Sequence, residues 1–363
     1  MELRPFPNAS PLQAWRDFSG RWNCGRIGVV ERNHKGIGTI DALTSGFNLI
    51  ARRPWTILLP IAINLIVWLG PRLSIAPLTH AAADALRATA TLQTGQYGEW
   101  VQSAAQSLTD WGEGANLVDL LGIGMPVLAV ASEGQTVWPV YNGPAAAALS
   151  GALLAGGILL MALYLVIIAQ QVRDERIALA AIAGRTWRVV WRLLVLGIVL
   201  LGITTVVSLP GVMGIGLLAL FSLQGAAILT SLLVWGALFL MVWLLFYLFF
   251  VLDAMALDDA GVGQAVSRSV VLVRQNVGPT LALALLTILL GVGLGEVWYV
   301  VAKTTAGIVA GVIANAYVAT ALVAASLIFY SSRWGALQKQ FGALVAPMVE
   351  KAAEQDQTDR PSE

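Results

Sequence analysis

The chain has 363 residues, of which 57% are hydrophobic and 12% are charged, and its formal net charge is +1. Soluble domains carry about a quarter charged residues because their surface faces water, so this composition excludes an ordinary soluble protein. The near-zero net charge, without a basic patch interleaved with aromatic residues, gives no sign of a nucleic-acid partner.

Long stretches of the chain carry no charge at all. Asp, Glu, Lys and Arg are absent from residues 54–71, 134–172, 193–252, 275–295 and 304–332. A membrane-spanning helix needs about 20 apolar residues, and the third block is long enough for two. The sequence therefore predicts an all-α, polytopic membrane bundle of six transmembrane helices.

The first part of the chain contains a tail, an amphipathic segment and a span. Residues 1–36 are mixed in character and are expected to form a cytoplasmic tail. In the segment 40–52, Ile40, Leu43 and Phe47 recur at helical spacing opposite polar residues, which predicts a helix lying along the interface. Arg52-Arg53-Pro54-Trp55 then marks the start of span one, 55–75.

Residues 77–143 interrupt the apolar pattern. They are rich in Ala, Thr and Gln, carry six acidic residues, and are expected to form an extracytoplasmic helical insertion. Helices are predicted at Thr79–Thr91 and Glu99–Trp111. The run Leu117–Ala131 is apolar but is broken by Gly122, Gly124 and Pro126, so we expect a loop or a segment that dips into the interface.

Five further spans follow, with two more amphipathic segments between them. The spans are expected at 146–170, 193–209, 223–252, 280–301 and 305–330. Pro210-Gly211 predicts a tight turn or a bent helix end. The segments are 177–192, with arginines on one stripe, and 262–275, where a valine stripe lies opposite Arg268. The tail 331–363 is expected to be helical to about Lys351.

The pattern repeats three times, each time as an interfacial helix followed by a two-span hairpin. Residues 37–330 would form the membrane domain, with both termini cytoplasmic. In that orientation, all of the 22 Lys and Arg residues except Arg72, Arg87 and Lys303 lie on the inner side, as the positive-inside rule requires. We therefore expect a multi-pass protein of the cytoplasmic (inner) membrane.

Two motifs carry a family resemblance: Arg52-Arg53-Pro54, and Gly263-Gln264-Ala265-Val266-Ser267-Arg268-Ser269 followed by Val273-Arg274-Gln275-Asn276. With them, residues 38–330 outside the insertion resemble a group of bacterial and archaeal six-span proteins that includes the membrane domain attached to some glycerophosphodiester phosphodiesterases. The resemblance implies the fold and the location. It does not imply phosphodiesterase activity, because the hydrolase is a separate domain in that family.

Three polar residues within the predicted spans are candidates for a transport path: Glu296, Asn315 and Asn64. An intramembrane carboxylate is costly and suggests ion or proton coupling. The alternative is that Glu296 is hydrated near the outer interface or paired with Lys303. The alternative for the two amides is an interhelical hydrogen bond.

Charged residues near the inner interface allow two further interpretations. Asp253, Asp258 and Asp259 could bind a divalent cation, although acids that favour the start of the next helix explain them as well. Five arginines could hold anionic lipid headgroups, or could simply set the topology: Arg52, Arg53, Arg185, Arg188 and Arg192. No motif indicates a cofactor, a resident metal or a catalytic residue.

Two functions from different classes follow. The first is a non-catalytic membrane protein that organises lipids, and with them other membrane proteins, at the cytoplasmic membrane. The second is a small permease or channel-like transporter that uses Glu296, Asn315 and Asn64. An intramembrane enzyme acting on lipid is a third alternative.

Overall fold

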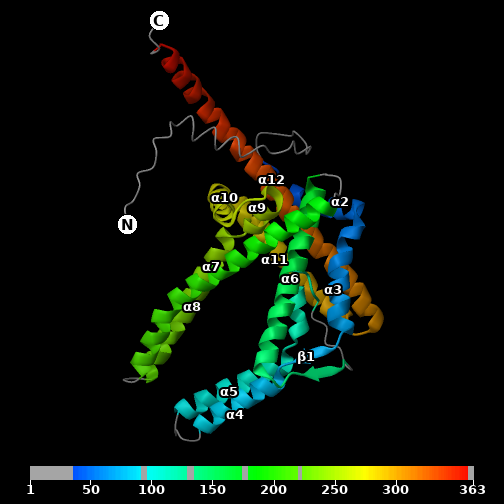
Figure 1. The fold of residues 1–363 in the computed structure, drawn as a ribbon, viewed down its shortest axis with the longest axis vertical. Coiled ribbons are helices and arrows are strands. Elements are labelled where there is room, and N and C mark those ends of the chain that lie inside the picture. The colour runs from blue at the N-terminus through cyan, green and yellow to red at the C-terminus, as the bar shows by residue number, and fades with distance from the viewer. Residues whose placement is uncertain (1–35, 91–95, 129–134, 174–178, 220–222, 359–363) are drawn as a thin grey trace.

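The computed structural model describes residues 36–90, 96–128, 135–173, 179–219 and 223–358. Nearly all of these residues are helical, and Figure 1 shows long helices running side by side. Five helices are long and apolar enough to cross a membrane, and a sixth span exists if a bent pair at the start is counted as one. The all-α, polytopic class predicted from composition is confirmed. The predicted N-terminal tail, except Gly36, lies outside the described residues.

The chain passes back and forth between the two ends of the bundle (Figure 1). Its elements are α2 (Thr39–Arg52), η1 (Pro54–Ile57), α3 (Leu58–Leu69), β1 (Arg72–Ser74), α4 (Ala76–Ala90), α5 (Gln96–Gly114), η2 (Leu117–Gly122), β2 (Val137–Pro139), α6 (Gly143–Val172), α7 (Leu179–Ala219), α8 (Leu223–Tyr247), α9 (Val251–Asp258), α10 (Val262–Gln275), α11 (Val277–Val301) and α12 (Thr305–Thr358). We call the end that carries α2, α9 and α10 the α2 end.

The first unit bends sharply between its amphipathic helix and its span. The chain turns by 95° between α2 and the η1–α3 segment. Proline restricts the residue before it to extended conformations, and Arg53 accordingly leaves the helix at φ −134° and ψ 62°. The predicted span 55–75 is shorter than expected, because α3 ends at Leu69 before Gly70-Pro71 and the chain then enters β1.

The insertion after span one forms a helical hairpin at the end opposite α2. Helices α4 and α5 confirm the two predicted helices and lie across that end of the bundle (Figure 1). Strands β1 and β2 pair in parallel there, with Leu73 opposite Trp138. The segment η2 and the residues after it, to Leu128, are non-α as predicted.

In the second unit the amphipathic segment and the span are a single helix. Helix α7 runs for 41 residues, about 60 Å, through the predicted junction at Arg192. The expected separate interfacial helix at 177–192 and the expected tight turn at Pro210-Gly211 are therefore wrong, since Pro210 lies inside α7. The first and third units have a proline at or near the junction, at Pro54 and Pro279. In the second unit the junction is Arg192-Leu193, which contains neither proline nor glycine.

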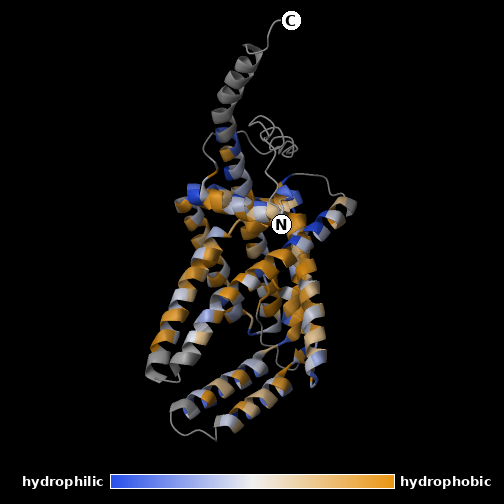
Figure 2. Cartoon of the chain, turned by 60° about the vertical axis from the view of Figure 1, so that its left-hand side comes forward, coloured by the Kyte–Doolittle hydropathy of each residue, from blue (hydrophilic) through white to orange (hydrophobic). Residues whose placement is uncertain are grey.

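Two boundaries in the second half also differ from expectation. Helix α8 ends at Tyr247, and after three non-helical residues the chain continues as the short helix α9. Helix α12 does not end near residue 330, but continues without a break to Thr358. Figure 2 shows apolar residues along the bundle helices and polar residues concentrated at the α2 end.

The core lies between α2, α6, α9 and α12. Its largest fully buried side chains include Tyr164, Phe250, Phe329 and Tyr330, and the Phe250 and Phe329 rings stack with centroids 5.7 Å apart. Helix α2 packs closely on α12 at Gly46, where a Cβ atom would lie 2.8 Å from the Ala325 nitrogen. The first and last described helices are therefore in direct contact.

Candidate functional site

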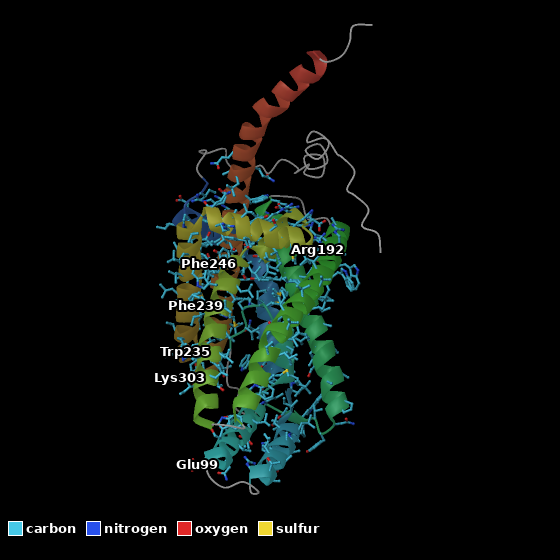
Figure 3. The ribbon with its side chains drawn as sticks, turned by 90° about the vertical axis from the view of Figure 1, so that its left-hand side faces the viewer. Glu99, Arg192, Trp235, Phe239, Phe246 and Lys303 are labelled. Carbon is cyan, nitrogen blue, oxygen red and sulfur yellow. The ribbon has the colours of Figure 1, made fainter. Side chains whose placement is uncertain are left out.

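Most of the buried charge in the described chain lies at the α2 end. Three aspartates of the α8–α10 region, Asp253, Asp258 and Asp259, each meet a different set of partners there. We call these three residues and their partners the aspartate layer. Figure 3 shows Arg192, one of those partners, at this end of the molecule, and Glu99 at the opposite end.

Asp258 joins three helices. It lies at the end of α9 and accepts hydrogen bonds from Arg268 Nη1 of α10 at 2.7 Å and from Tyr330 Oη of α12 at 2.8 Å. The guanidinium of Arg268 also lies 5.5 Å from the centre of the Trp334 ring. The Arg268 side chain is 7% exposed and that of Asp258 is 15% exposed. This pair is a buried, mutually neutralising link between α9, α10 and α12.

Asp259 binds the arginine stripe of α7. It follows α9 with φ 51°, the left-handed conformation that Asp tolerates better than most residues. Its carboxylate accepts hydrogen bonds from Arg188 Nε, at 3.0 Å, and from Arg192 Nη1, and it forms ion pairs with both arginines. Partial burial raises the pKa of Asp259, but the hydrogen bonds and charges of the two arginines outweigh it, so the pKa lies below its usual value.

Asp253 is the most deeply buried of the three. It is 4% exposed, and its Oδ2 accepts a hydrogen bond from Ser326 Oγ of α12 at 2.5 Å. Within the described residues no cationic side chain pairs with it. The break between α8 and α9 lies a few residues before Asp253. There Ser269 Oγ of α10 donates to the Tyr247 carbonyl and accepts from the Phe250 N–H, which satisfies two backbone groups of the break.

These separate partners do not favour a shared divalent cation. Within the described ranges, no group of three or more His, Cys, Asp or Glu residues is placed to hold a metal ion. Asp258 and Asp259 follow one another in sequence but turn to α10 and α7 respectively. The three aspartates serve as attachment points between helices.

Two of the three candidate path residues come together, and the third does not. Asn64 Nδ2 of α3 donates to the Pro126 carbonyl at 2.8 Å, and its Oδ1 accepts from the Leu128 N–H at 2.7 Å. Asn315 Nδ2 of α12 reaches the same carbonyl at 3.4 Å. Glu296 is exposed on α11 and makes no hydrogen bond or ion pair with the part of the chain that the structure describes.

The two asparagines hold a loop inside the bundle. The segment from η2 to Leu128 packs against the middle of α6, where Gly157 leaves room for the Leu120 carbonyl. Asn64 is 2% exposed and satisfies both a carbonyl and an N–H of that loop. The predicted loop between residues 117 and 131 therefore packs, as far as Leu128, against α3, α6 and α12, and its Pro126 carbonyl and Leu128 N–H are satisfied by side chains of α3 and α12.

The five arginines proposed to hold lipid headgroups have different surroundings. Arg188 and Arg192 pair with Asp259, and Arg53 donates to the Gln171 side chain. Arg52 is exposed, and Arg185 is half-buried. Asp259 thus engages Arg188 and Arg192 within the protein, and both the lipid-headgroup and the topology interpretations of the five arginines stay predictions.

Sequence reasoning missed Arg268 and Tyr330. The buried side of α10 carries Ala265, Arg268, Ser269, Leu272 and Val273, so Arg268 is buried on the same side as Val273, one member of the valine stripe that was expected to lie opposite it. The available signal was spacing: Ala265, Arg268, Ser269 and Leu272 recur every three or four residues. No family model matches the chain, and comparison with curated proteins and with solved structures finds no match either.

Proposed function

We propose that this multi-pass membrane protein organises other components at the membrane surface on the side of its α2 end, without a catalytic step. One observation carries the proposal. Helix α12 has 54 residues, about 80 Å, whereas the hydrocarbon core of a bilayer is about 30 Å thick. It packs in the core along its first half and then projects beyond every other helix at the α2 end (Figure 1).

The proposal places the protein in the cytoplasmic membrane, with its α2 end facing the cytoplasm. The assignment follows from charge: Lys and Arg concentrate at this end, whereas the α4–α5 hairpin is mostly acidic. Helix α2, set at 95° to its span, would lie along the lipid–water boundary. The resemblance to six-span membrane domains accords with this location.

The rigid connections of the aspartate layer also support an organising role. The layer ties α7, α9, α10 and α12 together through ion pairs and hydrogen bonds among its own members. A projecting helix fixed in such a base holds its far end at a defined place relative to the membrane. This arrangement suits the positioning of a partner protein.

Truncation of α12 tests the proposal. One variant ends after Gln340 and loses the projecting part of the helix, and a control ends after Thr358 and keeps it. Proteins crosslinked in cells are identified by quantitative mass spectrometry. We expect specific crosslinked partners with the full chain and the control, and their loss with the shorter variant. The same partners at the same yield with both variants would contradict the proposal.

A permease is the second proposal, and the α8–α9 break favours it. Transporters place ion sites where spanning helices are discontinuous, and here Asp253 and Ser326 lie one turn from such a break. Reconstituted vesicles separate the two proposals. Flux that Asp253→Asn or Glu296→Gln abolishes, in a protein that still folds, supports the permease. The absence of flux across a panel of ions and small solutes supports the organising role.

A further inference from the structure

A cavity of about 350 Å³ opens at the α2 end, apart from the aspartate layer. Four of its lining residues, Arg333, Ala336, Leu337 and Gln340, follow one face of α12 at spacings of three and four. The remaining wall comes from Gln275 at the end of α10, Asn276 before α11, and Gly36. The lining contains one cation, three side-chain amides and no carboxylate.

Arg333 differs from three other arginines of this end. Arg188, Arg192 and Arg268 each pair with an aspartate, whereas Arg333 makes no ion pair with any described residue. Its Nη1 donates to the neutral Asn276 Oδ1 at 3.3 Å, and its Nε is buried without a partner. The guanidinium lies 5.4 Å from the centre of the Phe329 ring. Its charge is thus held in place but not neutralised.

The surroundings keep this side chain in position. Ile37 N–H donates to Ser332 Oγ at 2.9 Å, and Gly36 packs directly against the Arg333 stem. A fixed guanidinium presents a planar fork of N–H donors, which matches the oxygens of a phosphate group, and amide side chains add further donors. A cavity of this size holds a phosphate with part of the group it esterifies.

We propose that this cavity binds a phosphate group, with Arg333 as its principal contact and Gln275 and Gln340 as further donors. The cavity lies where the apolar run of α11 begins and that of α12 ends, which is the level of lipid phosphates if the α2 end faces the cytoplasm. The phosphate belongs either to a lipid headgroup or to a soluble phosphate compound. The lipid source rests on the membrane-surface role proposed above.

The test uses the full chain and two probes. Nanodiscs of phosphatidylcholine with increasing phosphatidylglycerol supply the lipid, and inorganic phosphate at constant ionic strength supplies the soluble anion. Binding to the wild type is compared with Arg333→Gln and with Arg274→Gln, which removes the same charge from an exposed neighbouring position. We expect Arg333→Gln to weaken binding of at least one probe by about tenfold or more, and Arg274→Gln to change it little.

The probes distinguish the sources, and a second variant guards against misfolding. Arg333-dependent binding of phosphatidylglycerol alone assigns a lipid headgroup, and Arg333-dependent binding of inorganic phosphate assigns a soluble compound. Ala336→Phe fills the cavity while keeping Arg333, and it should lose the same binding. Wild-type binding to neither probe, or unchanged binding in Arg333→Gln or in Ala336→Phe, overturns the site.

The site and the organising role fail separately. Arg333→Gln should lose phosphate binding while keeping the crosslinked partners of α12. The chain ending after Gln340 should lose the partners while keeping phosphate binding, because every lining residue is still present.

Discussion

The spans of the α7–α8 hairpin and those of the α6–α9–α12 core are all strongly apolar but pack very differently. In the most apolar 18-residue windows of the α7 and α8 spans no residue is buried, whereas 56% of the corresponding window in α12 is buried. Along α8, Trp235, Phe239 and Phe246 follow one another (Figure 3), and the first two are 72% and 62% exposed; Figure 1 shows that α8 diverges from the rest of the bundle. Apolar character places a helix in lipid but does not bring it against its neighbours.

What separates the two regions is the presence of specific contacts. In the core, Gly46 admits the α12 backbone, Tyr164 Oη donates to Thr320 Oγ1 at 2.9 Å, and Asp253 accepts from Ser326. In the hairpin, Gly202 and Gly236 have no atom within 4 Å of a would-be Cβ. Because lipid tails are as apolar as leucine, small residues and hydrogen bonds decide which spans associate.

The largest expected effect is in the aspartate layer. Arg268→Met should destabilise the protein by about 3–5 kcal/mol, because it leaves Asp258 buried without its cation. The matched change Arg188→Met should cost about 1 kcal/mol or less, since Arg188 is half-exposed and Arg192 still pairs with Asp259. Unfolding midpoints in mixed micelles measure both. Equal losses would show that burial does not distinguish the two pairs.

The same aromatic truncation should separate core from hairpin. Phe250→Ala removes a fully buried ring from the stack with Phe329 and should cost about 3 kcal/mol. Phe239→Ala removes an exposed ring of α8 and should leave the unfolding midpoint nearly unchanged. A comparable loss for Phe239→Ala would show that the hairpin packs against something in the folded protein that is not part of this chain.

A glycine pair gives a smaller contrast. Gly46→Ala forces α2 away from Ala325 and should cost about 1–3 kcal/mol, as overpacking does. Gly202→Ala meets nothing and should be neutral or slightly stabilising, because alanine favours the helix. The measurement is the melting temperature of each variant in the same detergent. Identical shifts in melting temperature for the two variants would show that the α2–α12 contact does not contribute to the stability of the core.

The smallest expected effect is a pH dependence from Asp259. Its pKa is lower in the folded state than the usual 3.8, so its contribution is complete above that value and is lost as the pH falls through the folded pKa. The amount is about 1 kcal/mol or less because the pair is partly exposed. Asp259→Asn, which tolerates the same φ, should remove this part of the acid dependence. An unchanged acid profile in that variant would contradict the assignment.

The spans could be predicted from the sequence, because they depend on composition. The five long apolar spans and the two insertion helices follow from local residue content, whereas the sixth span exists only if the bent pair of α2 and η1–α3 is counted as one. The continuity of α7 could not be predicted from the periodicity of its charges. The one local indication is that the junction Arg192-Leu193 contains no proline or glycine to end the helix. The buried position of Arg268 depends on Asp258 and on Tyr330. Both lie outside α10, so the local sequence of α10 does not indicate them as partners.

The candidate site was predictable only in its parts. Asn64 and Asn315 were recognised as polar residues within spans, and the interhelical hydrogen-bond alternative for them is close to what the structure shows, with the added loop carbonyl of Pro126 as their common acceptor. Glu296 was selected by the same reasoning but lies apart from both. Its environment depends on the position of α11 relative to α12, which one helix alone does not determine.

The contact of α2 with α12 has a consequence for biosynthesis. Ribosomes deliver the chain from its N-terminus, so α2, α6 and α9 are synthesised before Ser326, Thr320 and Tyr330 of α12. Until then Asp253 has no hydrogen-bond donor from α12 and the groove beside Gly46 is unfilled. Nascent chains halted before α12 should therefore be incompletely packed and remain sensitive to quality-control proteases. Packing of α12 against α2, α6 and α9 is then a single late step that completes the core.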